Sequence, residues 1–290
     1  MFDNIFAAIE KWMRELLTGM VESNMSTMFT DVNEKTSEIA AQVGRTPQNW
    51  NSSVFSMIQN LSESVVVPIA GIIITLVLCY ELISMLTERN NLHDVDTWMF
   101  FKYFVKAWVA IYLVSNTFTI TMAVFDVGQS VVNSASGIIN GETAIDVSLL
   151  SMQMQAAMAT MEIGELVVLA LETFLVSFCM KIMSVVITVI VYGRMIEIYL
   201  YTSLAPIPFA TMSNREWGHV GTNYFRGLFA LAFQAFLMMV CVAIYAALIS
   251  SVRISSNMHS ALIGVAAYTV ILCFSLMKTG SLSKQIFGSH

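Results

Sequence analysis

The chain has 290 residues, of which 57% are hydrophobic and 12% charged, with a net charge of −6 and a mean hydropathy of +0.71. An average soluble domain is about 25% charged, so this composition excludes an ordinary water-soluble fold. The negative charge and the scattered Lys and Arg residues also argue against a basic nucleic-acid-binding patch. Several long apolar stretches predict an all-α, polytopic integral membrane protein.

The first 21 residues predict an amphipathic helix instead of a secretory signal. A signal peptide would combine a basic start, an unbroken apolar stretch and a small-residue cleavage site. Here polar residues interrupt the apolar ones, so we expect a helix that lies in the membrane interface or packs on a neighbouring subunit. The apolar positions follow helical spacing and are Phe2, Ile5, Phe6, Ile9, Trp12, Met13, Leu16, Leu17 and Met20.

Residues 23–63 form a polar segment that predicts one or two short helices. Asp31 with Glu34 resembles a capping box ahead of "EKTSEIAAQV", and Thr46 followed by Pro47 is typical of a helix start. The intervening "VGRTPQ" predicts a turn. A helix over 47–61 is then expected to lead directly into the first membrane span.

Five apolar stretches are each long enough to cross the ~30 Å hydrocarbon core of a bilayer. They divide the chain into an extracytoplasmic N-terminal part (1–63), a first pair of spans (64–126), an extracytoplasmic loop (127–164) and a part with three spans and the tail (165–290). We place the spans at 65–86, 104–125, 166–192, 228–250 and 261–277.

The segment "IYLYTSLAPIPFATM", residues 198–212, is apolar but predicts a broken helix. Its 15 residues would rise only about 22 Å. Pro206 and Pro208 remove two backbone donors and favour extended backbone at Ala205 and Ile207. Irregular backbone persists in a membrane only where protein or water surrounds it. We therefore expect a hinge or re-entrant turn, on the cytoplasmic side of the third span, that shapes the inner mouth of an assembly.

The basic residues predict the orientation of the chain. If 198–212 does not cross, one side holds eight of them, whereas residues 127–165 contain neither Lys nor Arg. By the positive-inside rule the N-terminus lies outside and the tail lies in the cytoplasm. The eight are Arg89, Lys102, Lys106, Arg194, Arg215, Arg226, Lys278 and Lys284.

Lys181 lies in the middle of the third span and is a functional-site hypothesis for that reason. Glu172 is on the same helix but about half a turn out of phase. Glu81, Asp126 or a neighbouring subunit is therefore a better partner for the ammonium group. A structural ion pair and a pore-facing cation both remain open at this stage.

A methionine-rich face is predicted in the extracytoplasmic loop. Methionine adapts to varied apolar partners, so this face indicates either a helix that lies on the bilayer or a docking surface for an extracellular partner. Its members, at helical spacing, are Leu150, Met154, Ala157, Met158 and Met161.

No residue pattern predicts catalysis or a cofactor. Phosphate-binding loops, nucleophile elbows and zinc-protease motifs are absent from the sequence. The four cysteines fall inside predicted spans without metal-ligand spacing, and "HDVD" at 93–96 is too sparse for a metal site. We predict a protein that is not an enzyme and binds neither metal nor cofactor.

Longer stretches of the sequence resemble the polytopic VirB/TrbL-type subunit of type IV secretion systems. The stretch "RMIEIYLYTSLAPIPFA" carries this likeness together with the order of spans and loops. "MFTDVNEK", "VVVPIAGIIITLVLCYELI", "NNLHDVDTW" and "FDVGQSVVNSASGII" resemble TrbL-like conjugal transfer proteins of Gram-positive conjugative elements. The resemblance implies a channel or scaffold subunit of a Gram-positive cell membrane, arranged as a homo-oligomeric ring with other secretion subunits. Passing DNA would touch it weakly and without sequence specificity.

Two other functions were considered. A secondary transporter could use Lys181, Glu172 and Glu81 as an ion or proton relay, but such proteins usually contain repeats with paired broken helices. Here five spans cannot form equal repeats, and only one broken element is visible. A structural membrane anchor for other subunits is the third possibility.

Overall fold

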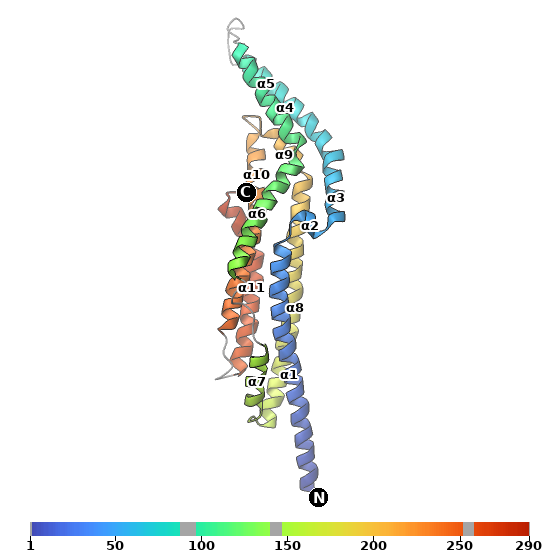
Figure 1. The fold of residues 1–290 in the computed structure, drawn as a ribbon, viewed down its shortest axis with the longest axis vertical. Coiled ribbons are helices and arrows are strands. Elements are labelled where there is room, and N and C mark those ends of the chain that lie inside the picture. Colours follow the sequence, from blue (N-terminus) through green and yellow to red (C-terminus); the bar gives the residue numbers. More distant parts are fainter. Residues whose placement is uncertain (1, 88–96, 140–146, 252–257, 290) are drawn as a thin grey trace. The chain divides into compact units, whose positions relative to one another are not determined.

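The structure is a computed structural model that describes residues 2–87, 97–139, 147–251 and 258–289 (Figure 1). This part of the chain is helical throughout and contains no strand, which confirms the all-α prediction. Five helical segments in it are long and apolar enough to cross a membrane, which confirms a multi-pass membrane protein with five spans. They are Ser52–Thr87, Thr97–Ser115, Ile163–Ser203, Gly218–Ser250 and Met258–Ile286.

The helices differ widely in length, and the three longest are α1, α8 and α10. Their bounds, in chain order, are α1 (Phe2–Val43), α2 (Pro47–Trp50), α3 (Ser52–Leu61), a π-helical turn η1 (Ser62–Val66), α4 (Val67–Thr87), α5 (Thr97–Ser115), α6 (Thr117–Ile139), α7 (Val147–Met158), α8 (Ile163–Ser203), α9 (Pro206–Thr211), α10 (Gly218–Ser250) and α11 (Met258–Ile286).

The chain divides into two compact units, and each is built from three separate segments. Unit 1 contains α1, α7, most of α8 and parts of α10 and α11. Unit 2 contains α2 to α5, most of α6, α9 and the remaining parts of α8, α10 and α11. The segments are Met1–Val43, Ser134–Val191 and Met238–Lys278 in unit 1, and Gly44–Asn133, Tyr192–Leu237 and Thr279–His290 in unit 2.

The N-terminal part is one continuous helix, α1, which corrects the prediction of separate helices before residue 43. Asp31 and Glu34 lie inside this helix and do not begin one. A capping box needs backbone that leaves the helix, and nothing between residues 20 and 43 supplies a Gly or Pro break. Packing also favours continuity, because one face stays buried throughout: Val21, Met25, Met28, Phe29, Ile39 and Val43.

The turn after α1 and the start of α2 follow the prediction. Thr46 caps α2, with its hydroxyl oxygen 3.2 Å from the backbone nitrogen of Asn49, and Pro47 occupies the first helical position. The expected helix over 47–61 is interrupted at Asn51, whose side chain accepts hydrogen bonds from the N–H groups of Ser53 and Val54. The helical path then continues through η1 into the first span, as predicted.

The second span was predicted at 104–125, and the structure places it earlier, at α5. The helix is interrupted at Asn116, whose side-chain amide donates to the carbonyl of Tyr112 at 2.9 Å. Apolar aromatic residues extend α5 before residue 104, whereas α6 carries Thr117, Thr121 and Asp126. The apolar stretch is thus shared between two helices, and only the first is apolar enough to span.

The predicted interruption in 198–212 is present, but its backbone differs from the prediction. α8 ends at Ser203, and α9 begins at Pro206. Ala205 has helical angles (φ −49°, ψ −40°) and Ile207 is inside α9, so neither is extended. Both prolines lie in the first turn, where missing N–H groups leave no bond unmade.

Helix α9 packs against α4 and α5 inside unit 2 (Figure 1). Its Phe209 and Ala210 belong to a buried cluster with Ala70, Ile74, Leu78, Ala110 and Val114. The short helix after the break is therefore covered by protein, the surroundings that irregular backbone requires at membrane depth.

Candidate functional site, the seam between helices α1 and α8

Lys181, Glu172 and Glu81, the charged residues predicted inside the spans, do not pair with one another in the described part of the chain. Glu172 forms an ion pair with His259 in unit 1, and Glu81 accepts a hydrogen bond from Lys106 in unit 2. Lys181 is exposed and pairs with no carboxylate in the described part of the chain. Each of the two carboxylates thus has its own nitrogen partner, and neither is Lys181.

The methionine-rich face predicted in the loop is buried inside unit 1. Met154 is 3% exposed and Met158 is 1% exposed, and their helix α7 packs against α1. These two methionines are core residues, which corrects the docking surface expected there. Met161 contributes its carbonyl oxygen to a hydrogen bond from Arg14, and the side chain of Leu150 lies outside the described part. The segment 93–96 is also outside it.

Helix α1 lies lengthwise along α8 in unit 1. The Arg14 guanidinium donates to the carbonyl of Met161 at 2.7 Å, the Asn24 amide lies 3.5 Å from the Thr173 hydroxyl, and the Lys35 ammonium donates to the Thr188 hydroxyl at 3.2 Å. Residue numbers rise together on both helices, so they run in the same direction. We call this contact line the α1/α8 seam.

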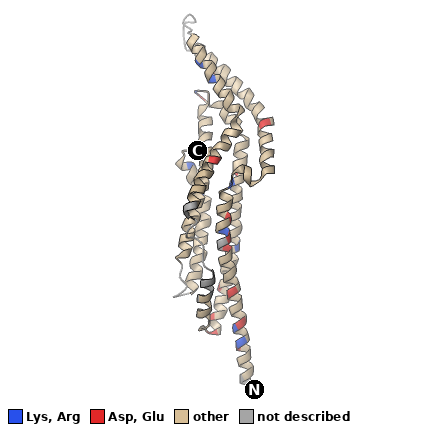
Figure 2. Cartoon of the chain, viewed as in Figure 1, with Lys and Arg blue, Asp and Glu red and all other residues tan. Residues whose placement is uncertain are grey.

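The seam is as long as a membrane span. From Arg14 to Lys35, α1 rises about 32 Å, against ~30 Å for the hydrocarbon core. α8 has 41 residues and is longer than a membrane span needs to be, so contact with it leaves the prediction of 1–63 as extracytoplasmic a prediction. Figure 2 shows charged residues at intervals along α1, which is too polar to count among the spans itself.

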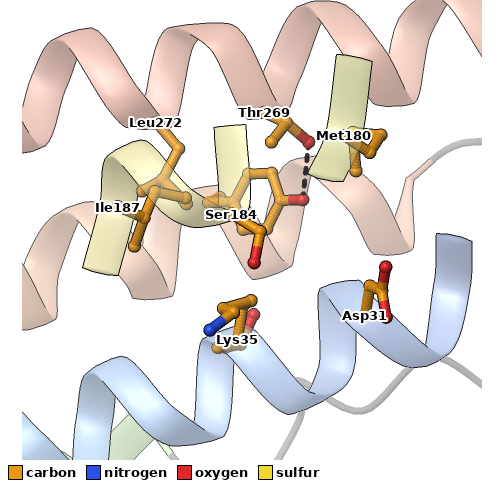
Figure 3. A pocket seen from close by; sticks show the side chains of 9 residues that line it. Asp31, Lys35, Met180, Ser184, Ile187, Thr269 and Leu272 are labelled. Atoms are coloured by element: carbon orange, nitrogen blue, oxygen red, sulfur yellow. Dashed lines mark hydrogen bonds between the residues drawn. The ribbon is translucent and has the colours of Figure 1, made fainter. Parts of the chain in front are cut away.

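A small, mainly apolar cavity lies beside the seam (Figure 3). Asp31 and Lys35 of α1 and Ser184 of α8 line it, together with Thr269, whose hydroxyl is 2.8 Å from that of Tyr245. Its volume is about 20 Å³, and Met180, Ile187 and Leu272 also line it.

Asp31 and Lys181 fall on the same seam. Asp31 is one turn before Lys35 on α1, and Lys181 is two turns before Thr188 on α8, so each lies on the edge that the Lys35–Thr188 bond marks. The two positions differ by about 4.5 Å along the seam. Asp31 has no hydrogen-bond or ion-pair partner among the described residues, and in this respect it resembles Lys181.

From Gly19 to Ala41 the outward face of α1 is polar and built of small residues, whereas the first half of the helix exposes large apolar side chains such as Phe6 and Trp12. Among the side chains described between Gly19 and Ala41, Met20 is the one large apolar side chain that is exposed. Glu34 carries the charge on this face and pairs with no cation in the part described. We call these positions the α1 polar face: Gly19, Ser23, Ser26, Thr30, Glu34, Ser37 and Ala41.

Sequence reasoning missed the continuity of α1, and with it the position of Asp31 on the seam, because it assigned residues 23–63 to one or two short helices. The spacing of Val21, Met25 and Met28 already followed a helical face. Its continuation through Ile39 and Val43 was the signal for one long helix with a buried stripe.

The comparisons with known proteins give one family. A family model described as "TrbL/VirB6 plasmid conjugal transfer like protein" matches residues 32–206, more than half of the chain. The match runs from the last third of α1 to the first residue of α9 and so contains Lys35, Lys181 and the end of α8. No curated protein and no solved structure gave a match.

Proposed function

The chain belongs to the TrbL/VirB6 plasmid conjugal transfer-like family, and we propose that it is a membrane subunit of a conjugative type IV secretion apparatus. In this proposal copies of the chain, with other secretion subunits, surround a water-filled path for DNA and attached protein. This family is one of secretion components and not of enzymes, in keeping with a role in passage and assembly.

The observation that carries the proposal is the α1 polar face. In this proposal the face lies at the depth of a span, where lipid offers no hydrogen bonds to Ser and Thr hydroxyls and disfavours a charge such as Glu34. Such a face is stable when protein or water covers it. A subunit of a conduit turns one polar face toward water, and α1 supplies that face.

The seam supports the orientation proposed from the basic residues. Arg14 contacts Met161, so the first half of α1 and the turn before α8 lie at the same level. With the loop 127–164 outside, the N-terminal part of α1 is also outside and the tail faces the cytoplasm.

The first test is genetic. Donor cells carry a clean in-frame deletion of the gene, and DNA transfer frequency is measured with and without complementation in trans, with growth followed in parallel. We expect transfer to be lost, growth to be unchanged and complementation to restore transfer. Normal transfer from the deletion strain would contradict the proposal.

The second test addresses the water-filled path. Single cysteines replace Ser26 or Thr30 on α1, and Leu171 or Val185 on the exposed face of α8, in a background where the four native cysteines are replaced by Ser or Ala. A membrane-impermeant maleimide is applied to intact cells, and labelling and transfer are measured. We expect labelling and reduced transfer at the α1 positions and neither at the α8 positions. Equal protection of both faces would refute the path along α1.

A further inference from the structure

The first turns of α1 are exposed on all sides in the described part of the chain. Every side chain from Asn4 to Trp12 is exposed, and these turns extend past α7 and the start of α8 within unit 1 (Figure 1). Arg14 contacts the carbonyl of Met161, two residues before α8 begins. Between Asn4 and Arg14 the helix therefore projects about 15 Å beyond that level.

One side of these turns carries large apolar side chains that are between 48% and 61% exposed. They alternate by four and three residues along the chain, which is the spacing of the seam between helices that pack on one another. A different side of the helix is polar, and there the Lys11 ammonium lies 3.9 Å from the Glu15 carboxylate. We call the four large side chains the α1 apolar stripe: Ile5, Ile9, Trp12 and Leu16.

The α1 apolar stripe is in line with the α1 polar face. Gly19 and Ser23 follow Leu16 with the same alternation of three and four residues, and Ser26 and Thr30 continue it. One outward line along α1 is therefore large and apolar as far as Leu16 and small or polar from Gly19 onward. The two halves of this line differ in the surroundings that suit them.

Lipid does not supply a partner for the α1 apolar stripe. Amphipathic helices that bind lipid lie in the plane of the membrane interface, whereas α1 runs along α8, which is a span. With the third span at its predicted position, 166–192, the level of Arg14 and Met161 is already outside the hydrocarbon core. The stripe projects further out, where water surrounds it, and a contiguous exposed apolar surface of this kind is typical of a contact with protein.

We propose that the α1 apolar stripe packs against the same stripe of other copies of this chain, so that the first turns of α1 form a parallel helical bundle outside the membrane. The inference rests on the proposed function, in which the α1 polar faces of several copies turn toward one water-filled path. Because the stripe and the polar face share one line, the stripes then point toward the same axis. Copies related by rotation about that axis present the same four residues at the same height.

Crosslinking between copies tests the proposal. In the full chain without its native cysteines, Ile9→Cys and Trp12→Cys lie on the stripe, and Ala7→Cys and Lys11→Cys are exposed sites at nearly the same height on another side of the helix. Membranes from donor cells are treated with a short homobifunctional maleimide, and covalent dimers of the chain are measured by immunoblot. We expect dimers from the two stripe positions and loss of this product at the two matched positions.

A charge placed in the stripe tests the packing itself. Ile9→Glu added to the Trp12→Cys protein should remove the covalent dimer, because a carboxylate would be buried between the helices. Ala7→Glu added to the same protein adds an equal charge away from the stripe and should leave the dimer unchanged. Both proteins should insert at the parent level, since neither exchange lies in a span.

Three results would overturn the proposal: dimers that are equally abundant at stripe and matched positions, dimers that persist with Ile9→Glu, or a crosslinked product with a different subunit in place of the dimer. These readouts do not depend on DNA transfer. Loss of transfer in the deletion strain without stripe dimers would therefore refute this inference alone, and stripe dimers with normal transfer from the deletion strain would refute the proposed function alone.

Discussion

α1 and α8 run along each other in unit 1, and their outward faces differ in chemistry. α8 exposes Leu171, Leu175, Phe178, Ile182 and Val185, whereas the α1 polar face presents mainly Ser, Thr and Gly. Both helices bury an apolar stripe against the same bundle. Burial alone does not distinguish the two helices, and the chemistry of the outward side does: an apolar outward side suits lipid, whereas the small polar side chains of α1 suit water or protein.

The largest effect is expected from a charge placed on each face. Val185→Lys on α8 puts an ammonium group into lipid, at a cost of about 2.5–3.5 kcal/mol. Thr30→Lys on α1 meets water or polar protein and costs little. The amount of inserted protein in membrane fractions, measured by immunoblot, should fall about a hundredfold for the first variant and stay near the parent level for the second.

The control for the two Lys variants is substitution of the same two positions by Leu. Val185→Leu and Thr30→Leu change size without adding charge, and both proteins should insert normally. Thr30→Leu should nevertheless lower DNA transfer, because it replaces a hydroxyl on the polar face. If Thr30→Lys lost as much inserted protein as Val185→Lys, the two faces would share one environment and the comparison would be wrong.

Removing the side chain that fixes α1 to the bundle should have the next largest effect. Met28 is buried, and Met28→Ala leaves a cavity, for which about 2 kcal/mol is expected at the lower end of the range for such changes. Met20, exposed on the same helix, is the matched site, and Met20→Ala should be silent. Thermal unfolding in detergent measures both, and an unchanged melting temperature for Met28→Ala would contradict packing of α1 on the bundle.

A charge exchange across the seam should give a smaller effect. Asp31 and Lys181 have no partner in the described residues, and their positions differ by about 4.5 Å along the same seam, which makes them candidates for a charge pair. We expect Asp31→Lys and Lys181→Asp each to lower transfer about fivefold and the double variant to recover it, a coupling typical of neighbouring charges. Additive losses in the double variant would show that the two charges act separately.

A neutral variant separates pairing from pore lining. Lys181→Met removes the ammonium but keeps a long apolar side chain on the α8 face. A structural pair predicts a modest loss that Asp31→Asn reproduces, whereas a pore-facing cation predicts a loss that Asp31→Asn does not. Normal insertion, assembly and transfer in Lys181→Met would remove any functional role for Lys181.

The sequence predicted the features that depend on residues within one short segment of the chain. Apolar length gave five spans, and the Thr46–Pro47 pair gave the start of α2, because hydrophobic transfer and capping are local. It failed where tertiary contacts decide. The seam exists because Arg14, Asn24 and Lys35 find acceptors more than a hundred residues away, and Met154 and Met158 are buried because α7 packs on α1.

The smallest effect is expected where the exposed face of α8 ends, at the break before α9. Pro206→Ala with Pro208→Ala restores two N–H groups, but Phe209 and Ala210 stay buried and hold α9 in place. We expect unfolding in detergent to change by less than about 1 kcal/mol, with normal insertion and a moderate loss of transfer if the break is a hinge. Single exchange of Pro208, which lies further inside the first turn, should have less effect than exchange of Pro206. Transfer at the parent level in the double variant would show that the break is maintained by packing on α4 and α5 and not by the prolines.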